Sequence, residues 1–311
     1  MYSCSIVKNR IDIDSHADGE PLLHIAFGVD ENFIRPASIV ILSILKANKN
    51  KKLKFHVFIS KISNNSVRKL SELCADISIH VFDDARFKEM QERENLPISM
   101  YYRIIVPYIL KDETEKVLYL DADLLCVCNI DDLINYTFKY DKLACVVNHK
   151  TIDEDNVNSL ELKDKTHYFN SGVMLINTLP WVNVDILSLF SCKISSRDFK
   201  YPDQDVLNII LENRVVYISQ VFNNFMEDVK SGDETVFIHF TGSPKPWQMW
   251  YEKSNIYDAF YNDSPWSDIA YDSPKTSRQM RIYSKKLSKA GMLKLSIYWK
   301  IKYFINKLSG K

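Results

Sequence analysis

The sequence predicts an α/β protein with a mainly parallel central sheet flanked by helices. Short apolar runs alternate with longer segments of helical periodicity, and 46% of the 311 residues are hydrophobic, which is enough for a sizeable core. The chain holds only seven glycines, and none of them forms the Gly-rich loop of P-loop or dinucleotide-binding proteins. These observations favour an α/β protein whose ligand site is neither a P-loop nor a dinucleotide-binding loop.

The first elements follow one another in a regular order. Residues 1–22 are polar, and we expect an irregular N-terminal extension there. The pattern then predicts three strands and two intervening helices, the first opened by Pro36, over residues 24–29, 36–48, 53–60, 64–76 and 77–82. Strands separated by helices indicate a parallel sheet, because parallel neighbours need a crossover connection.

The remaining elements continue this alternation. Residues 99–110 are predicted to be helical, with a bend near Pro107. Further strands are expected over residues 116–120, 142–147, 171–177, 214–219 and 235–240, with helices around 181–194 and 204–213.

Two carboxylates follow a buried strand in the segment KVLYLDADLLC. Asp121 and Asp123 are separated only by Ala122, and apolar residues lie on both sides. Burying an unpaired carboxylate is costly, so a compensating charge is needed. Alternate residues of a strand share a face, which lets both carboxylates point at one divalent cation. A purely structural pair is the alternative.

Polar or turn-forming residues also follow two other predicted strands. They are Asp30 and Asn32 after the first strand, and His239, Gly242 and Lys245 at the last. Ligands of open α/β sheets bind beyond the carboxyl ends of the strands, which favours a site here. Each residue also has a simpler interpretation: a helix cap for Asp30, a core histidine for His239 and a turn around Gly242.

A further polar group stands where a strand and a helix begin. Asn170 precedes an apolar strand, and Asp203 and Gln204 open a helix. A capping role explains Asp203 but does not explain a glutamine between two acids. Arg103 lies in an otherwise apolar helix, where an arginine is usually paired with a carboxylate or a phosphate.

The charge is balanced overall and unevenly distributed. Lys and Arg number 40, as do Asp and Glu, so there is no global bias toward nucleic acid. From residue 275 onward the chain has eleven basic residues and no acidic residue, which leaves a formal charge of −11 on the rest. A basic tail on an acidic body suggests that the tail has its own partner.

The expected location is the cytoplasm, either in solution or peripherally bound to a membrane. The six cysteines lack the spacing of a zinc site and are expected to be reduced thiols. No apolar run approaches the ~20 residues of a transmembrane helix. The first residues also lack the apolar centre of a signal peptide.

Six motifs resemble, in order, those of the retaining glycosyltransferases of family 8, and especially the bacterial members that add glucose or galactose to the lipopolysaccharide core. The motifs are AFGVDENF (26–33), MYYRIIVPYIL (100–110), VLYLDADLLC (117–126), YFNSGVMLIN (168–177), YPDQDVLN (201–208) and HFTGSPKPW (239–247). A single DxD is weak evidence, whereas six ordered motifs are specific.

This resemblance implies a GT-A fold with residues 23–262 as the catalytic domain. It also implies a UDP-glucose or UDP-galactose donor and a Mn²⁺ or Mg²⁺ ion. The implied roles are metal binding by Asp121, Asp123 and His239, uridine contacts by Asp30 and Asn32, sugar contacts by Arg103, Asn170, Asp203 and Gln204, and diphosphate contacts by Gly242 and Lys245.

The residue type at Gln204 helps to decide between double displacement and front-face attack. Retention normally indicates a double displacement through a carboxylate nucleophile. The family pattern places Gln204 at that position, and an amide is a poor nucleophile. We therefore favour front-face attack, in which Gln204 stabilises the oxocarbenium-like centre and Asp203 orients the sugar hydroxyls.

Residues 263–311 form a basic, aromatic segment that also resembles the family. Gly291 is expected to divide it into two helices. Its lysines, with Trp299 and Phe304, fit an interfacial anchor on an anionic membrane. Such an anchor would hold the enzyme on the inner face of the bacterial inner membrane, beside its lipopolysaccharide acceptor. A helix packed on the domain with a solvated basic face is the alternative.

Three other functions fit parts of the pattern. A haloacid-dehalogenase-type phosphatase also has a strand followed by DxD, but Leu125 stands where Thr or Val is usual. A non-catalytic sugar-nucleotide binding protein would not need intact Asp121, Asp123, His239 and Lys245. A glycogenin-like, self-glucosylating enzyme is the alternative within the family, and the basic tail disfavours it.

Overall fold

The computed structural model describes residues 6–15, 19–83, 99–139, 141–149, 154–226, 234–252 and 255–308. The chain forms two compact units, Met1–His239 and Phe240–Lys311. The predicted boundary after residue 262 falls inside the second unit.

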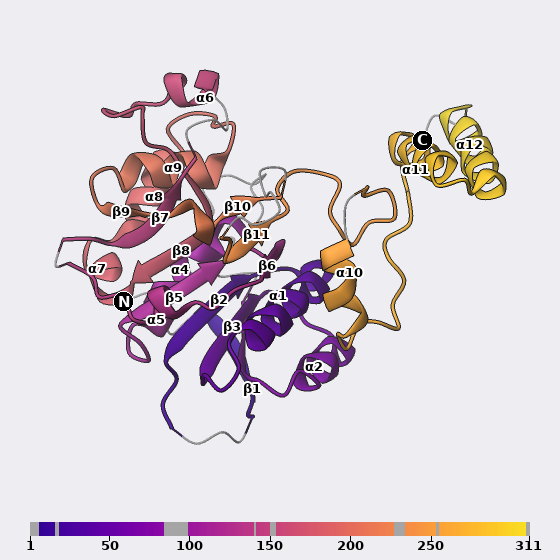
Figure 1. Cartoon of the computed structure of the whole chain (residues 1–311). Coiled ribbons are helices and arrows are strands. Elements are labelled where there is room, and N and C mark those ends of the chain that lie inside the picture. Colours follow the sequence, from indigo (N-terminus) through magenta and orange to yellow (C-terminus); the bar gives the residue numbers. More distant parts are fainter. Residues whose placement is uncertain are drawn as a thin grey trace. The chain divides into compact units, whose positions relative to one another are not determined.

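An eight-stranded sheet forms the centre of the first unit (Figure 1). In spatial order its strands are β1 (Val7–Ile13), β4 (Asp76–Phe82), β3 (Leu53–Ile59), β2 (Leu23–Gly28), β5 (Lys116–Leu120), β8 (Phe169–Asn177), β7 (Ala144–Asn148) and β9 (Val215–Ile218). Strands β4, β3, β2 and β5 run parallel, as do β7 and β9, while β1 and β8 are antiparallel to their neighbours. The mainly parallel sheet is confirmed.

Strand β1 corrects one expectation from the sequence. Irregular structure was predicted for residues 1–22, but Val7–Ile13 pairs with β4. Only Val7, Ile11 and Ile13 are half-buried, and the intervening polar side chains are exposed. The apolar alternation is weak because an edge strand buries little of its surface, and the polar residues therefore concealed it.

Helices connect these strands and cover the sheet. In the first unit they are α1 (Ile34–Ala47), α2 (Asn64–Ser71), α4 (Ser99–Leu110), α5 (Asp131–Ile134), α6 (Glu154–Ser159), α7 (Thr178–Asn183), α8 (Ile186–Ile194) and α9 (Pro202–Ile210). Helix α1 begins earlier than predicted, because Asp30 caps a 3₁₀ turn, η1 (Glu31–Phe33), that leads directly into it.

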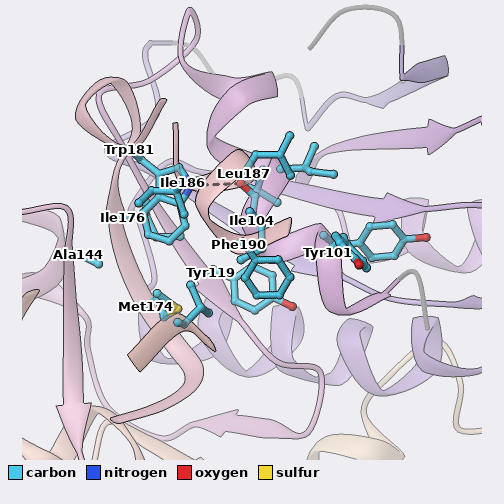
Figure 2. Close-up of a cluster of buried hydrophobic side chains, with 14 of the residues drawn as sticks. Tyr101, Ile104, Tyr119, Ala144, Met174, Ile176, Trp181, Ile186, Leu187 and Phe190 are labelled. Carbon is cyan, nitrogen blue, oxygen red and sulfur yellow. Dashed lines mark hydrogen bonds between the residues drawn. The ribbon is translucent and has the colours of Figure 1, made fainter. Parts of the chain in front are cut away.

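A large apolar cluster fixes the position of β5 (Figure 2). Tyr101 of α4 packs edge-on against Phe190 of α8, and Tyr119 of β5 lies in the same cluster. The buried Trp181 keeps a hydrogen bond, because its indole N–H donates to the carbonyl oxygen of Ile104 at 3.1 Å. The strand that leads into Asp121 is therefore held by packing on α4 and α8.

A second, three-stranded sheet stands apart from the central one. It consists of β10 (Asn224–Phe225), β11 (Phe237–His239) and β6 (Leu124–Cys126). Strand β11 pairs antiparallel with β6 and places His239 opposite Leu124. The strand predicted over residues 235–240 therefore exists in shorter form, and it belongs to this small sheet instead of extending the central one.

The second unit contains helices α10 (Asn255–Asn262), α11 (Ser277–Lys289) and α12 (Leu293–Leu308). Thr276 and Gln279 form a capping box at the start of α11. Gly291, with φ of +74°, lies between α11 and α12, which confirms the predicted division of the segment. Among the described residues, no helix combines the length and the apolar character needed to cross a membrane.

Three buried histidines form a hydrogen-bonded row across β2, β3 and β4. Nδ1 of His24 lies 2.9 Å from Nε2 of His56, and Nδ1 of His56 lies 3.1 Å from Nε2 of His80. Burial lowers the pKa of all three imidazoles, for His80 to about 3, and nearby cations add to this effect. The folded protein therefore holds the row neutral near pH 7.

This row should make the protein sensitive to mild acid. An unfolded histidine has a pKa of about 6.5, so below that pH the unfolded state binds more protons than the folded state. The contribution of these histidines to the free energy of unfolding is fully present above about pH 6.5. It falls as the pH drops toward their lowered pKa values in the folded state, by up to about 1.4 kcal/mol per histidine per pH unit.

The substitution His80→Gln removes one of these groups and should flatten the pH dependence of the free energy of unfolding, measured by urea denaturation between about pH 7.5 and about pH 5. Leu179→Gln, at a side chain that is 53% exposed and does not ionise, is the control and should leave the slope unchanged. Identical slopes for wild type and His80→Gln would contradict the prediction.

Candidate active site

Asp121, Asp123 and His239 meet at the carboxyl end of β5. The two aspartates lie in the turn between β5 and β6, and the pairing of β6 with β11 brings His239 beside them. Nε2 of His239 lies 3.1 Å from Oδ1 of Asp123, and one ligand atom from each of the three residues lies within 4.8 Å of the others. Two carboxylates and one imidazole fit Mn²⁺ or Mg²⁺.

The strand conformation predicted for Asp121 and Asp123 was wrong. A regular strand was expected to present Asp121 and Asp123 on one face, but β5 ends at Leu120. The turn that follows brings both carboxylates together, so the outcome is the same while the cause differs.

Gly172 of β8 allows this close arrangement. A Cβ at this position would lie 2.5 Å from Cε1 of His239, 2.7 Å from Oδ2 of Asp121 and 2.9 Å from Oδ1 of Asn170. The backbone N–H of Asp121 also donates to the Gly172 carbonyl at 2.8 Å. Strand β8 therefore sets the spacing of the cluster, and a side chain at Gly172 would displace its members.

Arg103 of α4 joins two of the predicted carboxylates. Its Nη2 lies 3.1 Å from Oδ1 of Asp121 and 3.2 Å from Oδ2 of Asp203, and its Nη1 donates to the carbonyl of Ser171 at 2.9 Å. Burial alone would lower the pKa of Arg103, but Asp121 and the other nearby acidic groups outweigh it and raise that pKa above its ordinary value. The expectation of a paired arginine is confirmed.

The pKa of Asp121 is raised, and burial is the largest cause. Arg103 acts in the opposite direction, while the nearby carboxylate of Asp123 raises the pKa further. The guanidinium thus compensates only part of the negative charge at this strand end.

Asn170 and Gln204 lie side by side in the hydrogen-bond network. Nδ2 of Asn170 donates to Oε1 of Gln204 at 2.8 Å, and the same oxygen accepts from the backbone N–H of Ser171 at 3.2 Å. Nε2 of Gln204 donates to the hydroxyl of Tyr168 at 2.9 Å, and that hydroxyl lies 2.6 Å from Oδ1 of Asp205. The amide of Gln204 is therefore held at both ends.

The other predicted residues are placed as follows. Asp30 and Asn32 lie just beyond the carboxyl end of β2, the neighbour of β5. Oδ1 of Asp30 accepts from the backbone N–H of Asn32 at 2.8 Å, so Asp30 does act as a cap. Gly242 and Lys245 belong to the second unit. Gly242 has a φ of +73°, and Nζ of Lys245 donates to the Phe240 carbonyl at 2.8 Å.

Several residues of the site were not singled out from the sequence. Tyr168 and Asp205 lie inside two of the six motifs, and their place there was an available signal. Asn223 lies with Oδ1 2.9 Å from Nδ1 of His239, and the ring of His149 stacks on Phe225 with centroids 4.2 Å apart. Neither Asn223 nor His149 falls in a motif, so only their spatial position identifies them.

Two other features are weaker candidates for the active site. A cavity of about 660 Å³ has Lys116 and Asn177 in its lining, at the ends of β5 and β8 away from the carboxylates. His24, His56 and Glu113 form a second possible metal-ligand group. Both ring nitrogens of His56 already bond to histidines, and Glu113 pairs with an arginine of β1, so these groups are engaged.

The mainly parallel sheet and the carboxylate–imidazole cluster beyond one of its central strands are features of the GT-A glycosyltransferases. The chain belongs to glycosyltransferase family 8. The model of that family matches residues 24–251, and the model of the family's C-terminal region matches residues 251–307. The resemblance inferred from the motifs is confirmed, and the protein is a glycosyltransferase.

Curated relatives match along nearly their whole length. The lipopolysaccharide glucosyltransferase WaaO of Escherichia coli K12 is 31% identical over 97% of this chain and 96% of its own. The lipopolysaccharide 1,3-galactosyltransferase of Salmonella typhimurium LT2 is 30% identical over 97% of each chain.

Solved structures confirm the fold. The galactosyltransferase LgtC, in complex with donor and acceptor sugar analogues, superposes with a TM-score of 0.63 at 20% identity, covering 81% of this chain and 98% of that chain. The bifunctional glycosyltransferase WbbM superposes with a TM-score of 0.68 at 20% identity, covering 81% and 51%.

We expect Gly172→Ala to weaken binding of Mn²⁺ without changing any ligand. The added methyl group must displace His239 or Asp121, and a disturbed ligand geometry should lower the affinity by about tenfold or more. Titration of the full chain with Mn²⁺, followed by electron paramagnetic resonance, measures the affinity. Gly19→Ala is the control: with φ of +93° the added methyl group strains the backbone, but it meets no atom within 4 Å and no metal ligand. Wild-type affinity in Gly172→Ala would show that the ion binds elsewhere.

Proposed function

We propose that this protein transfers glucose or galactose from UDP-glucose or UDP-galactose to a sugar of the lipopolysaccharide core, with retention of configuration and with Mn²⁺ or Mg²⁺. Its relatives in Escherichia coli and Salmonella typhimurium, named as lipopolysaccharide glucosyl- and galactosyltransferases, support the sugar and the acceptor. The observation that carries the proposal is the cluster of Asp121, Asp123 and His239 beside the buried Gln204.

The proposed roles are those that the resemblance to family 8 implies. Asp121, Asp123 and His239 would hold the divalent cation, whose charge would offset negative charge on the departing diphosphate. Asp30 and Asn32 contact the uridine, and Gly242 and Lys245 bind the diphosphate. Lys245 supplies a second positive charge to the leaving group.

Gln204 supports a front-face mechanism. Its Oε1 already accepts two hydrogen bonds, from Nδ2 of Asn170 and the backbone of Ser171. Both lone pairs are thus engaged, and a covalent attack by this oxygen would have to break at least one of these bonds. We infer that the Gln204 amide stabilises positive charge at the anomeric centre by its dipole, while Asp203, fixed by Arg103, orients the sugar hydroxyls.

Removal of the metal tests the proposed function. With truncated lipopolysaccharide as acceptor, chelation by EDTA should abolish transfer of radiolabelled glucose or galactose from the UDP-sugar, and added Mn²⁺ should restore it. Asp123→Asn should lower kcat/KM by about a hundredfold or more. Asp112→Asn, at a carboxylate that is 79% exposed, is the matched control.

Two results would contradict this proposal. Full wild-type activity in EDTA would remove the metal from the reaction. Labelling of the protein itself, in the absence of acceptor, would instead favour the glycogenin-like alternative.

We also propose that residues 263–311 bind the inner face of the bacterial inner membrane. Helix α12 exposes many apolar side chains, and seven of them are more than half exposed: Leu293, Leu295, Ile297, Ile301, Phe304, Ile305 and Leu308. Basic side chains are exposed on the same helix, at Lys294, Lys300, Lys302 and Lys307. Exposed apolar side chains accompanied by cations favour an anionic lipid surface.

Introducing negative charge among the exposed apolar side chains of α12 tests this anchor. The double substitution Ile301→Asp and Ile305→Asp should release the full chain from vesicles of phosphatidylglycerol, because buried apolar area and lipid attraction are lost together. Leu179→Asp changes an exposed leucine of the first unit and should leave binding unchanged. A double variant that still sediments with the vesicles at physiological salt would place the membrane contact elsewhere.

A further inference from the structure

A continuous chain of polar side chains links His239 to Asp205. Its members, in order, are His239, Asn223, Asn170, Gln204, Tyr168 and Asp205. The successive contacts measure 2.9, 3.0, 2.8, 2.9 and 2.6 Å. The chain thus connects the candidate metal ligand His239 with the side chain beneath the proposed donor sugar, Gln204.

The direction of this chain is fixed at the Asp205 end. Asp205 is completely buried, and it accepts from Nδ2 of Asn156 at 2.8 Å and from the backbone N–H of Tyr201 at 3.0 Å. An ionised carboxylate is only an acceptor, so the hydroxyl of Tyr168 must donate to it. That hydroxyl has a single proton, and its oxygen must therefore accept from Nε2 of Gln204.

Backbone donors fix the two amides that follow. Oε1 of Gln204 faces the N–H of Ser171, and Oδ1 of Asn170 faces the N–H of Gly172 at 3.0 Å. Turning either amide over would place an NH₂ group against a backbone N–H, which is a contact between two donors. Oδ1 of Asn170 also faces the Asn223 side chain, which must present its Nδ2 there.

The last step reaches the imidazole. Because Nδ2 of Asn223 donates to Asn170, its Oδ1 faces Nδ1 of His239 and can only accept. Nδ1 of His239 must therefore carry a proton. In the neutral ring the lone pair is then on Nε2, the nitrogen that faces Asp123.

We propose that Asn223 is a positioning residue that fixes His239 in the tautomer required for metal binding, and that this lock is anchored at Asp205 through the two intervening amides. The proposal rests on the proposed function, because it assigns the metal to His239. A histidine ligand commonly donates its other ring N–H to an oxygen that sets its tautomer and orientation, and here the amide oxygen of Asn223 has that place.

Asn223 is itself held firmly in position. It is completely buried, and its backbone N–H donates to the carbonyl of Gln220 at 2.9 Å. A side chain with a fixed backbone and two fixed partners has one orientation available, so it can transmit orientation between the amides and the imidazole.

Two substitutions at Asn223 separate positioning from a general structural role. Asn223→Ala removes the acceptor and should weaken Mn²⁺ binding by about 10- to 100-fold, the usual effect of losing such a partner. Asn223→Asp keeps an oxygen against Nδ1 of His239 and should retain Mn²⁺ affinity close to that of the wild type. The same variant loses the donor to Asn170, so its kcat should fall although its metal affinity is kept.

The control is Asn224→Ala, at the adjacent asparagine, whose side chain donates to Thr235 at 2.9 Å instead. It should bind Mn²⁺ like the wild type. Mn²⁺ affinity is measured on the full chain by electron paramagnetic resonance, and thermal unfolding followed by circular dichroism checks that each variant is folded. Wild-type affinity in Asn223→Ala, or equal weakening in Asn223→Asp and Asn223→Ala, would overturn the proposal.

A second measurement does not require metal. In the metal-free wild type at alkaline pH, ¹⁵N chemical shifts of labelled histidine should place the proton of His239 on Nδ1, and Asn223→Ala should shift it toward Nε2. A proton on Nε2 in the wild type would refute the lock. A proton on Nδ1 in a protein that binds no Mn²⁺ would support the lock and refute the proposed metal dependence, so the two failures can be distinguished.

Discussion

The pairing of β11 with β6 is the constraint on which the candidate site depends. It joins β6 to a strand far along the chain and places the imidazole of His239 against the carboxylate of Asp123, 116 residues away in sequence. Closing so long a loop costs entropy, which the backbone hydrogen bonds of the small sheet and the burial of Phe237 help to offset. Without this pairing, the turn after β5 would present carboxylates with no nitrogen ligand.

The same strand end shows why small and charged residues must coexist there. Gly172 leaves room for His239, Asp121 and Asn170 to approach one another, and Arg103 crosses from α4 to bind two carboxylates. The arginine is buried, so its charge-assisted hydrogen bonds are stronger than they would be in water. The aromatic cluster around α4 and α8 holds the helix that carries it (Figure 2).

Much of this arrangement could be predicted from the sequence, for identifiable reasons. The central strands are apolar on both faces, and their polar ends stand out, which located Asp30, Asp121 and His239. Arg103 was recognisable because an unpaired cation in an apolar helix is costly. These signals depend on a few neighbouring residues, and the sequence contains them directly.

The features that escaped prediction depend on contacts between distant segments. Strand β1 is stabilised by pairing with β4, and its own alternation is weak. The importance of Asn223 comes from two partners, Asn170 and His239, that are remote in sequence. The turn that gathers Asp121 and Asp123 was mistaken for a strand because both conformations place two acids near one another. Local patterns cannot distinguish such cases, since the deciding interactions are tertiary.

The charges of the site give an independent argument for a divalent cation. Among the described residues, three carboxylates, those of Asp121, Asp123 and Asp203, surround the single guanidinium of Arg103. These carboxylates outnumber the guanidinium, and burial of net charge is costly. The raised pKa of Asp121 expresses that cost. In the neutral tautomer fixed by Asn223, Nε2 of His239 and Oδ1 of Asp123 are two acceptors 3.1 Å apart, which repel unless a cation or a proton lies between them. A doubly charged ion bound by these atoms would neutralise the carboxylates and would also remove this repulsion. Neither a monovalent ion nor one added proton would do both.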